Sequence, residues 1–441
     1  MLSKLIKTIA NDYTNLVYSL IVITTFSGAL RKWAGLPIIF NNLFLLIMVL
    51  IPIYMLFIFK NEKTTTLNPT IKPILLIFCF VLILLAIHPL NLTYFHGVFG
   101  IFIHLTFIAI ILAYLKNQNS FNETKIVRLF FIILTTQIII SSIQYSSPPD
   151  SIINRYADNR QENIEDPRTG EEVEFVQASA TVGDAVRVTG TFSYLGGYTA
   201  VVFFFMLLTF YLSKKKNIKY FFWLAPLVIF AALLSGSRGT VAINLIFILA
   251  FIFTERKLLI SNPKPIFTAT GTIAVLMIVN LTIGDFLGIV DKVDTAYENF
   301  RDRVESNKEE SQGRLTGDLT EIFSRDFDYR YTGVGLGSTY QGTNALFGTS
   351  IIVQNTPMEG ELFRILVEGG LFFLLFRWSF IIVIFRYLEI PILLKITFFL
   401  FFCVFAQNVF HLYNAIYFAT GLIILNQAYK KENVLLDYER N

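Results

Sequence analysis

Charged residues are scarce in this sequence. They make up 15% of 441 positions, whereas hydrophobic residues make up 54%, and the mean hydropathy is +0.59. A soluble domain of this length carries more charge and less apolar surface. The composition therefore excludes a soluble globular protein and indicates an integral membrane protein.

Cysteine and histidine are also rare, which bears on cross-links and metals. The two cysteines, Cys79 and Cys403, lie inside apolar segments, so neither is placed to cross-link a polar stretch or to bind a metal with its neighbours. The four histidines are scattered, with no HExxH or Asp-rich motif, so no catalytic metal is expected. Hydrogen-bonded or interface-facing histidines are favoured at His88, His96, His104 and His411.

The alternation of apolar and polar residues typical of membrane β-strands is missing. The apolar runs are instead continuous and rich in Phe, Leu and Ile, which indicates helices. The predicted fold is all-α and polytopic, with about twelve transmembrane helices. The expected segments are 14–30, 36–59, 71–87, 92–115, 124–145, 190–212, 217–234, 239–253, 264–283, 361–385, 391–408 and 412–428.

Basic residues are concentrated in alternate short loops. By the positive-inside rule these loops are cytoplasmic, and with twelve spans both termini are cytoplasmic as well. The basic residues are Lys60, Lys63, Lys72, Lys116, Lys125, Lys214, Lys215, Lys216, Lys219, Arg256, Lys257, Lys264, Lys430 and Lys431.

Two long polar stretches then face the outer side. The predicted organisation is helices one to five in 1–145, an outer loop in 146–189, helices six to nine in 190–283, a large outer loop in 284–360, and helices ten to twelve with a cytoplasmic tail in 361–441. The outer stretches are acidic and the inner loops basic. Anionic lipid explains lysines beside a membrane, so nucleic acid is not an expected partner.

A few cations lie on the side where positive charge is disfavoured. Arg31 and Lys32, in LRKW, fall in the first outer loop. Such residues either anchor the chain to outer headgroups or bind a negatively charged substrate. The sequence leaves both possibilities open.

Arg238, in SGSRG, is predicted at the first turn of the eighth helix. A cation there opposes the helix dipole unless an anion is bound, and Ser235 and Ser237 could join free N–H groups in holding a phosphate. An arginine reaching toward the interface is the alternative. Arg187 borders the sixth span in the same way, and Arg314 either joins this set or is an ordinary loop charge.

The tenth span begins with a predicted helix cap. Thr356, Pro357 and Glu359 fit the N-cap, N1 and N3 positions, so Glu359 is interpreted as a capping residue.

Three ionisable residues follow on one face of the tenth span. Glu361, Arg364 and Glu368 lie at i, i+3 and i+7, so they face either the bundle interior or a wet cavity. Ionisable groups at membrane depth usually mark a site, although a structural ion pair is the alternative. Glu361, nearest the outer end, is the candidate base.

The sequence GVGLGS contains Gly333, Gly335 and Gly337. No strand and βαβ context surrounds it, so it does not indicate dinucleotide binding. A flexible turn or a close approach of two backbones is favoured.

The order of these motifs resembles the O-antigen ligase and polymerase superfamily. The resemblance rests on SGSRG, on GR followed after 18 residues by GVGLG, and on a polar helix entry ending in EGG. LRKW and RVTGTFSYLGGY further resemble exopolysaccharide and O-antigen polymerase-like members. The similarity covers residues 25–375, and its motifs are short.

The resemblance implies a GT-C-like glycosyltransferase of the bacterial cytoplasmic membrane, acting on undecaprenyl-pyrophosphate-linked glycans on the outer, periplasmic side. The family arginines that hold pyrophosphate map onto Arg238 and, by weaker matches, onto Arg187 and Arg314; Arg31, Lys32 and Arg364 are further candidate binding residues. Ligases of the family carry a His-Asn pair where this chain has Gln354-Asn355-Thr356. That departure favours a polymerase over a ligase and leaves Glu361 as the base.

The expected reaction joins a lipid-linked donor to a lipid-linked acceptor with no cofactor and no metal. The partners implied are both lipid-linked oligosaccharides, membrane lipid, a chain-length regulator and a flippase. A ligase acting on lipid A core or protein is one alternative. A polysaccharide or lipid transporter is another, although no internal repeat typical of transporters is found.

The topology can be tested by labelling single cysteines placed in 146–189, in a protein whose Cys79 and Cys403 are replaced by serine. We expect a membrane-impermeant maleimide to label them from the outer side of intact cells, because the stretch lies on the side opposite the basic loops. Labelling only from the cytoplasmic side would overturn the topology.

Overall fold

The structure is a computed structural model. It describes residues 12–34, 38–60, 64–148, 151–154, 163–165, 172–174, 181–182, 185–186, 188–192, 195–261, 330–340, 343–344, 347–348, 361–401 and 411–440.

The described residues are predominantly helical, as the sequence predicts. The helices are α2 (Tyr13–Trp33), α3 (Ile38–Ile53) continued by the π-helix η1 (Tyr54–Ile58), α4 (Ile71–Ala86), α5 (Tyr94–Asn117) continued by the 3-10 helix η2 (Gln118–Ser120), α6 (Glu123–Ser146), the 3-10 helix η3 (Ile152–Asn154), α7 (Leu195–Lys215), α8 (Lys219–Leu234), α9 (Arg238–Thr254), α10 (Arg256–Ser261), α16 (Glu361–Arg386), α17 (Ile392–Leu400) and α18 (Leu412–Arg440). Four short strands form two antiparallel pairs, β1 (Asn163–Glu165) with β2 (Glu172–Glu174) and β3 (Thr181–Val182) with β4 (Ala185–Val186).

Helices occupy the predicted apolar segments that lie in the described part of the chain. The segment 264–283 lies outside it. The segment predicted at 190–212 begins later, since α7 starts at Leu195 and residues 188–192 form a loop instead; the segment predicted at 412–428 ends later, since α18 runs to Arg440.

Five of these helices are long and apolar enough to cross a membrane: Tyr13–Trp33, Tyr94–Ser120, Glu123–Ser146, Leu195–Lys215 and Glu361–Arg386. Large apolar side chains are exposed on the helices, among them Phe80, Phe253 and Phe372. A surface of this kind suits lipid rather than water. The chain is therefore a membrane-embedded, helical protein, and the count of twelve spans stays a prediction.

The chain divides into two compact units. Unit 1 contains Met1–Ile21, Leu46–Ile126 and Asn307–Asn441, and unit 2 contains Val22–Leu45 and Val127–Ser306. In unit 1, α5 packs against α4 and α18, and α16 packs against α4. Phe78 of α4 stacks on Phe373 of α16 with ring centroids 6.1 Å apart.

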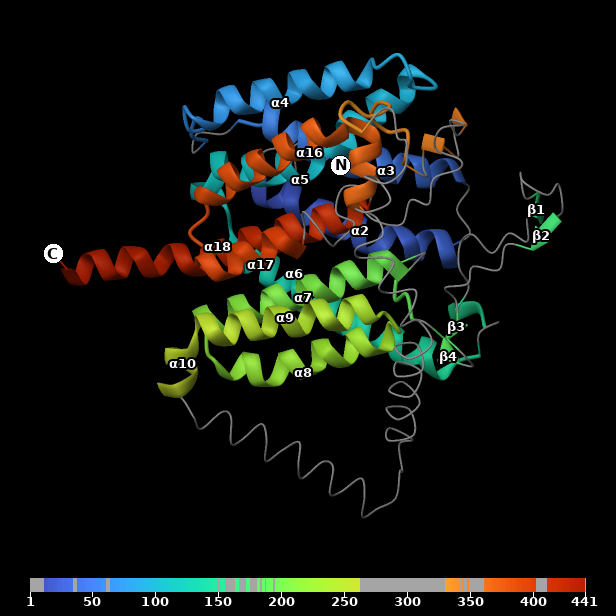
Figure 1. Ribbon diagram of the computed structural model, residues 1–441. Helices are drawn as coiled ribbons and strands as arrows, with labels where there is room; N and C mark the ends of the chain where they lie inside the picture. The colour runs from blue at the N-terminus through green and yellow to red at the C-terminus, as the bar shows by residue number, and fades with distance from the viewer. Residues whose placement is uncertain are drawn as a thin grey trace, which may run out of the picture. The chain divides into compact units, whose positions relative to one another are not determined.

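Unit 2 has α7, α8 and α9 side by side (Figure 1). Aromatic rings fill the contact between them. The rings of Phe210 and Phe251 stack with centroids 4.3 Å apart, and Phe203 meets Phe247 edge to face at 4.7 Å. Both pairs join α7 to α9, so they hold these two helices in register by shape as well as by apolar burial.

In unit 1 the glycine-rich segment 333–337 lies directly against α5. An added Cβ on Gly337 would lie 2.0 Å from the carbonyl oxygen of His96, and one on Gly100 would lie 2.5 Å from the Cβ of Leu336. The backbone of Gly337 also has φ of 75°. The close backbone approach predicted for GVGLGS is thus confirmed.

This contact predicts an asymmetry between two glycines. Both Gly337→Ala and Gly348→Ala place a side chain at positive φ, which costs about 1 kcal/mol. Only Gly337→Ala also drives a Cβ into backbone, since the nearest atom to a Cβ at Gly348 is a leucine methyl 3.4 Å away. We expect Gly337→Ala to lower the melting temperature of the detergent-purified protein clearly more than Gly348→Ala. Equal shifts would contradict the tight packing.

Candidate functional site

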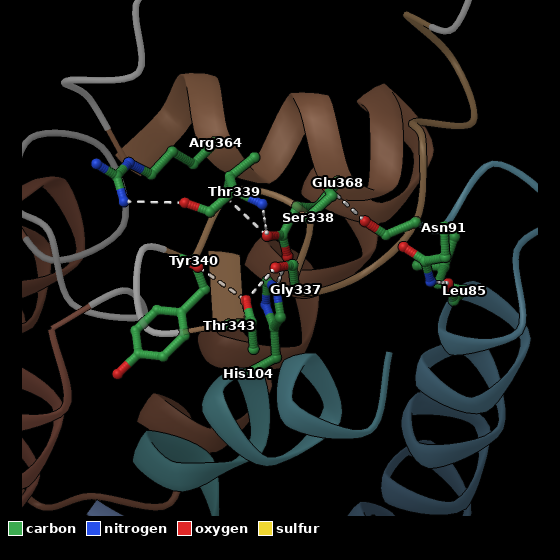
Figure 2. Close-up of polar contacts among 11 residues, drawn as sticks. Leu85, Asn91, His104, Gly337, Ser338, Thr339, Tyr340, Thr343, Arg364 and Glu368 are labelled. Atoms are coloured by element: carbon green, nitrogen blue, oxygen red, sulfur yellow. Dashed lines mark hydrogen bonds and ion pairs between the residues drawn. The ribbon is translucent and has the colours of Figure 1, made fainter. Parts of the chain in front are cut away.

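The carboxylate of Glu368 is the centre of a buried polar cluster in unit 1 (Figure 2). Its side chain is 0% exposed. The Nε2 atom of His104, on α5, donates to Oε2 at 2.9 Å, and Thr339 donates to Oε1 twice, from its backbone N at 3.0 Å and its Oγ1 at 2.7 Å. Because an ionised carboxylate only accepts, Nε2 carries the proton in the bond from His104.

Arg364 reaches the same loop from one turn earlier on α16. Its guanidinium NH1 donates to the carbonyl oxygen of Thr339 at 3.4 Å. Thr339 therefore bridges Glu368 and Arg364, with its N–H and hydroxyl toward the carboxylate and its carbonyl toward the guanidinium (Figure 2). The charges of both Glu361 and Glu368 act on Arg364.

The predicted polar stripe on α16 is buried, as expected. Glu361 is 2% exposed, Arg364 7% and Glu368 0%. The apolar residues between them are buried as well, so this end of the helix is covered all round rather than on one face. Glu361, the candidate base, is the first residue of α16.

Backbone bonds fix the glycine loop on α16. Val334 N donates to the carbonyl of Val367 at 2.8 Å, and Gly335 N to that of Glu368 at 3.0 Å. An added Cβ on Gly333 would lie 2.4 Å from the same Glu368 oxygen. Glycine at these positions lets two backbones touch and brings Thr339 to the carboxylate.

A second polar cluster lies in unit 2 and contains Lys32. The side chain is 4% exposed, and its Nζ donates to Oγ1 of Thr189 at 2.9 Å, to the carbonyl of Gly190 at 3.0 Å and to that of Phe192 at 2.9 Å. Lys32 was predicted either to anchor headgroups or to bind substrate. Its ammonium binds the oxygens of the RVTGTF loop, which is a structural contact that neither interpretation had foreseen; both interpretations stay predictions.

Two glutamines of α6 hold the same loop. Gln144 Oε1 accepts from the backbone N of Thr189 at 3.2 Å and of Gly190 at 2.8 Å. Gln137 Oε1 accepts from Thr191 N at 3.1 Å, and its Nε2 donates to Thr191 Oγ1 at 2.5 Å. Sequence reasoning missed both glutamines, although amides seven residues apart on an apolar helix could have signalled them.

The loop also contacts the last residue of α8, directly before the SGSRG turn. Val188 N donates to the carbonyl of Leu234 at 3.4 Å. Ser237 caps α9 by accepting from Thr240 N at 3.4 Å. Arg238 is the first residue of that helix, as predicted. LRKW and RVTGTF, far apart in sequence, thus meet directly, and RVTGTF also reaches the residue that precedes SGSRG.

The remaining predicted site residues divide into two groups. Arg31 is half-buried in the last turn of α2, and its role stays a prediction. Several others lie outside the described residues: Arg187, Arg314, Gln354, Asn355, Thr356, Pro357 and Glu359, together with the side chain of Arg238.

Two of the histidines are hydrogen-bonded, which confirms the interpretation favoured for them. His104 bonds Glu368, and His96 contacts Thr93 Oγ1 at 2.9 Å and the carbonyl of Gly348 at 3.0 Å. His411 precedes α18, and burial together with the charge of Arg364 lowers its pKa to about 4. Among the described residues, no three His, Cys, Asp or Glu side chains gather as a metal site would require.

Comparison with known proteins adds no relative. No protein-family model, no curated protein and no solved structure matches this chain.

The Lys32 contacts predict a stability difference between neighbouring cations. Lys32→Met removes the ammonium donor from three loop oxygens, one of which, the carbonyl of Gly190, also accepts from Gln144 Nε2 at 3.3 Å; we expect a loss of about 2 to 4 kcal/mol by analogy with broken buried ion contacts. We expect a large fall in the melting temperature in detergent for Lys32→Met, and a smaller one for Arg31→Met in the same turn. A larger fall in the melting temperature for Arg31→Met than for Lys32→Met would refute the role of Lys32 in holding the 189–192 loop.

Proposed function

We propose that this protein is a membrane glycosyltransferase that polymerises undecaprenyl-pyrophosphate-linked oligosaccharide repeat units into O-antigen, capsule or exopolysaccharide. The reaction would occur on the outer side of the bacterial cytoplasmic membrane. One observation supports the proposal: of the motif segments that suggested the resemblance, LRKW bonds the 189–192 loop through Lys32, and Val188 bonds Leu234, the residue directly before SGSRG, all within unit 2.

The start of α9 and the neighbouring 189–192 loop have features that favour binding of an anion. Arg238 begins α9, where free N–H groups and the helix dipole favour negative charge. Lys32, Gln137 and Gln144 hold the neighbouring loop rigidly, and preorganised donors stabilise developing charge without rearrangement. In this proposal Arg238, with Arg187 and Arg31, neutralises the pyrophosphate of the donor.

The proposed step is a direct displacement at the anomeric carbon. The acceptor hydroxyl oxygen forms a bond to that carbon while the carbon–oxygen bond to pyrophosphate breaks and the pyrophosphate takes the electron pair. A carboxylate takes the hydroxyl proton. Glu361 is the candidate for this base; both oxygens of Glu368 are already bonded to His104 and Thr339.

Two other functions remain candidates for test. A ligase would transfer the glycan to lipid A core or protein, and the missing His-Asn pair in 354–356 argues against it. A transporter of polysaccharide or lipid would use broken helices and acidic groups along a path through the membrane, and α16, interrupted at Gly370 after the buried Glu361 and Glu368, is the observation that keeps this candidate. A chain-length regulator and a flippase are the protein partners that a polymerase would need.

Purified protein in liposomes with an undecaprenyl-pyrophosphate-linked oligosaccharide provides the direct test. We expect a ladder of products at multiples of the repeat unit. Arg238→Ala and Glu361→Gln should each slow its formation by about 100-fold or more, the usual effect of losing a charge-stabilising donor or a general base.

The matched control is Arg256→Ala, since Arg256 is exposed and begins α10 as Arg238 begins α9. Its ladder should equal that of the unmodified protein. A single transfer to added lipid A core or protein would identify a ligase. No product with any acceptor would count against glycan transfer.

A further inference from the structure

His104 of α5 contacts α16 on both sides of the interruption at Gly370. Its Nε2 donates to Glu368, before the interruption, at 2.9 Å. Its ring meets that of Phe373, after the interruption, edge to face with centroids 5.2 Å apart. Gly370 has φ of 68° and ψ of −177°, a conformation essentially restricted to glycine. The pair of His104 and Glu368 therefore lies at the break of a helix.

The pair also lies near the middle of a predicted membrane span. His104 follows Tyr94, the first residue of α5, by ten residues, which is roughly 15 Å along the helix. This is about half of a hydrocarbon layer of about 30 Å. Ionisable groups at this depth are costly and usually mark ion or proton pathways. Broken helices near the midplane form the sites for coupling ions in transporters.

The chemistry of the pair suits a proton rather than a metal cation. A hard cation takes a shell of oxygen ligands, whereas both oxygens of Glu368 accept from N–H and O–H donors of His104 and Thr339. A further proton can be received by Nδ1 of the neutral imidazole or by the carboxylate. Because the two groups interact directly, that proton belongs to the pair rather than to one residue.

The buried charges around the pair are balanced without a further proton. The carboxylates of Glu361 and Glu368 and the guanidiniums of Arg364 and Arg377 are all buried on α16, and the charges of Glu368 and Arg377 act on His104. One added proton leaves a net positive charge at a site where both side chains are 0% exposed. Such a charge is costly without water, so proton binding requires that water reach the pair.

Residues 333–339, named the strap here, cover the carboxylate of the pair. All seven are buried and none is helical, so part of the strap can move without unfolding α5 or α16. Thr339 bonds Glu368 from its backbone N at 3.0 Å and from its Oγ1 at 2.7 Å (Figure 2). Bonds to an ionised acceptor are stronger than bonds to a neutral one. Protonation of the pair therefore weakens the hold of Glu368 on the strap.

We propose that His104 and Glu368 form a proton-binding site at the break of α16 and that the strap is its lid, so that binding of one proton is coupled to movement of the strap. This activity goes beyond the proposed glycan transfer, which uses neither residue. By the predicted topology the strap packs on the outer end of α5, so the proton comes from the outer side. Such a site links a proton gradient to a conformational step.

The test measures how readily a buried strap residue becomes accessible at different pH. Ser338 is 4% exposed, and Thr332, just before the strap, is exposed. Ser338→Cys and Thr332→Cys are each placed in the full chain without Cys79 and Cys403, and the readout is the ratio of their maleimide labelling rates in detergent. Because both thiols share the intrinsic effect of pH on reactivity, the ratio reports movement of the strap.

We expect the ratio to rise as the pH falls from about 8 to about 5, the range in which histidine changes charge. One linked proton allows a rise of up to about tenfold for each unit of pH. Thr339→Val removes one donor to Glu368 and should raise the ratio about tenfold at every pH, the usual effect of losing a bond to a charged group.

Three further variants locate the proton. Glu368→Gln imitates the protonated carboxyl and should give a high ratio that does not change with pH. His104→Gln keeps an N–H donor but should abolish the rise in this range, since a carboxylate alone changes charge near about pH 4. His96→Gln is the control on the same helix, because His96 also lies against the strap and has its own bonds; it should leave the rise unchanged.

Each other result counts against the proposal. A ratio that does not change with pH would leave the pair as a structural contact only. The same rise in Glu368→Gln or His104→Gln, or its loss in His96→Gln, would assign the proton to another group. An effect of sodium at constant pH, with none of protons, would make this a metal-cation site. If a variant of the pair fails to fold, the rise itself and its increase in Thr339→Val still decide.

Discussion

The carboxylate of Glu368 lies with no exposed surface among apolar side chains of α16 and its neighbours. An ionised group in such surroundings is costly unless donors surround it. His104 and Thr339 supply those donors from two separate segments. The need to satisfy this one group therefore ties α5, the glycine loop and α16 together, and the loop geometry around residues 333–339 follows from it.

In unit 2 the buried charged group is a cation, and it too needs hydrogen-bond partners. The buried ammonium of Lys32 has three oxygen acceptors, all from one loop. Gln137 and Gln144 satisfy the N–H groups of that loop. An unpaired polar group is costly in the interior of a membrane protein, and here the buried loop is held by side chains that reach it from α2 and α6.

Local sequence patterns predicted much of the fold. The span predicted at 71–87 is the helix Ile71–Ala86, Arg238 begins α9, and the stripe of Glu361, Arg364 and Glu368 is buried. Helix periodicity, hydropathy and capping are properties of neighbouring residues, so the sequence displays them directly.

Pairings between distant residues could not be predicted in this way. His104 and Glu368 are 264 positions apart, and Lys32 and Thr189 are 157 apart. The sequence around each of these residues does not indicate its partner, because many polar residues in apolar helices could form such a pair. For Lys32 the bonds to the 189–192 loop were therefore not predicted, whereas the glycines of GVGLGS signalled a close contact without indicating its partner.

The interruption of α16 at Gly370 has a consequence for how this helix becomes part of the membrane. Gly370 has φ of 68° and ψ of −177°, which separates the helix into rods of roughly 14 Å and roughly 24 Å at 1.5 Å per residue. Neither rod alone matches a hydrocarbon layer of about 30 Å. Leu371 N donates to Arg330 and Phe372 N to Tyr331, so residues from the preceding polar stretch cap the second rod. The start of the second rod therefore takes its hydrogen-bond acceptors from a segment outside the helix, and the bent span depends on residues 330–331 as well as on its own sequence.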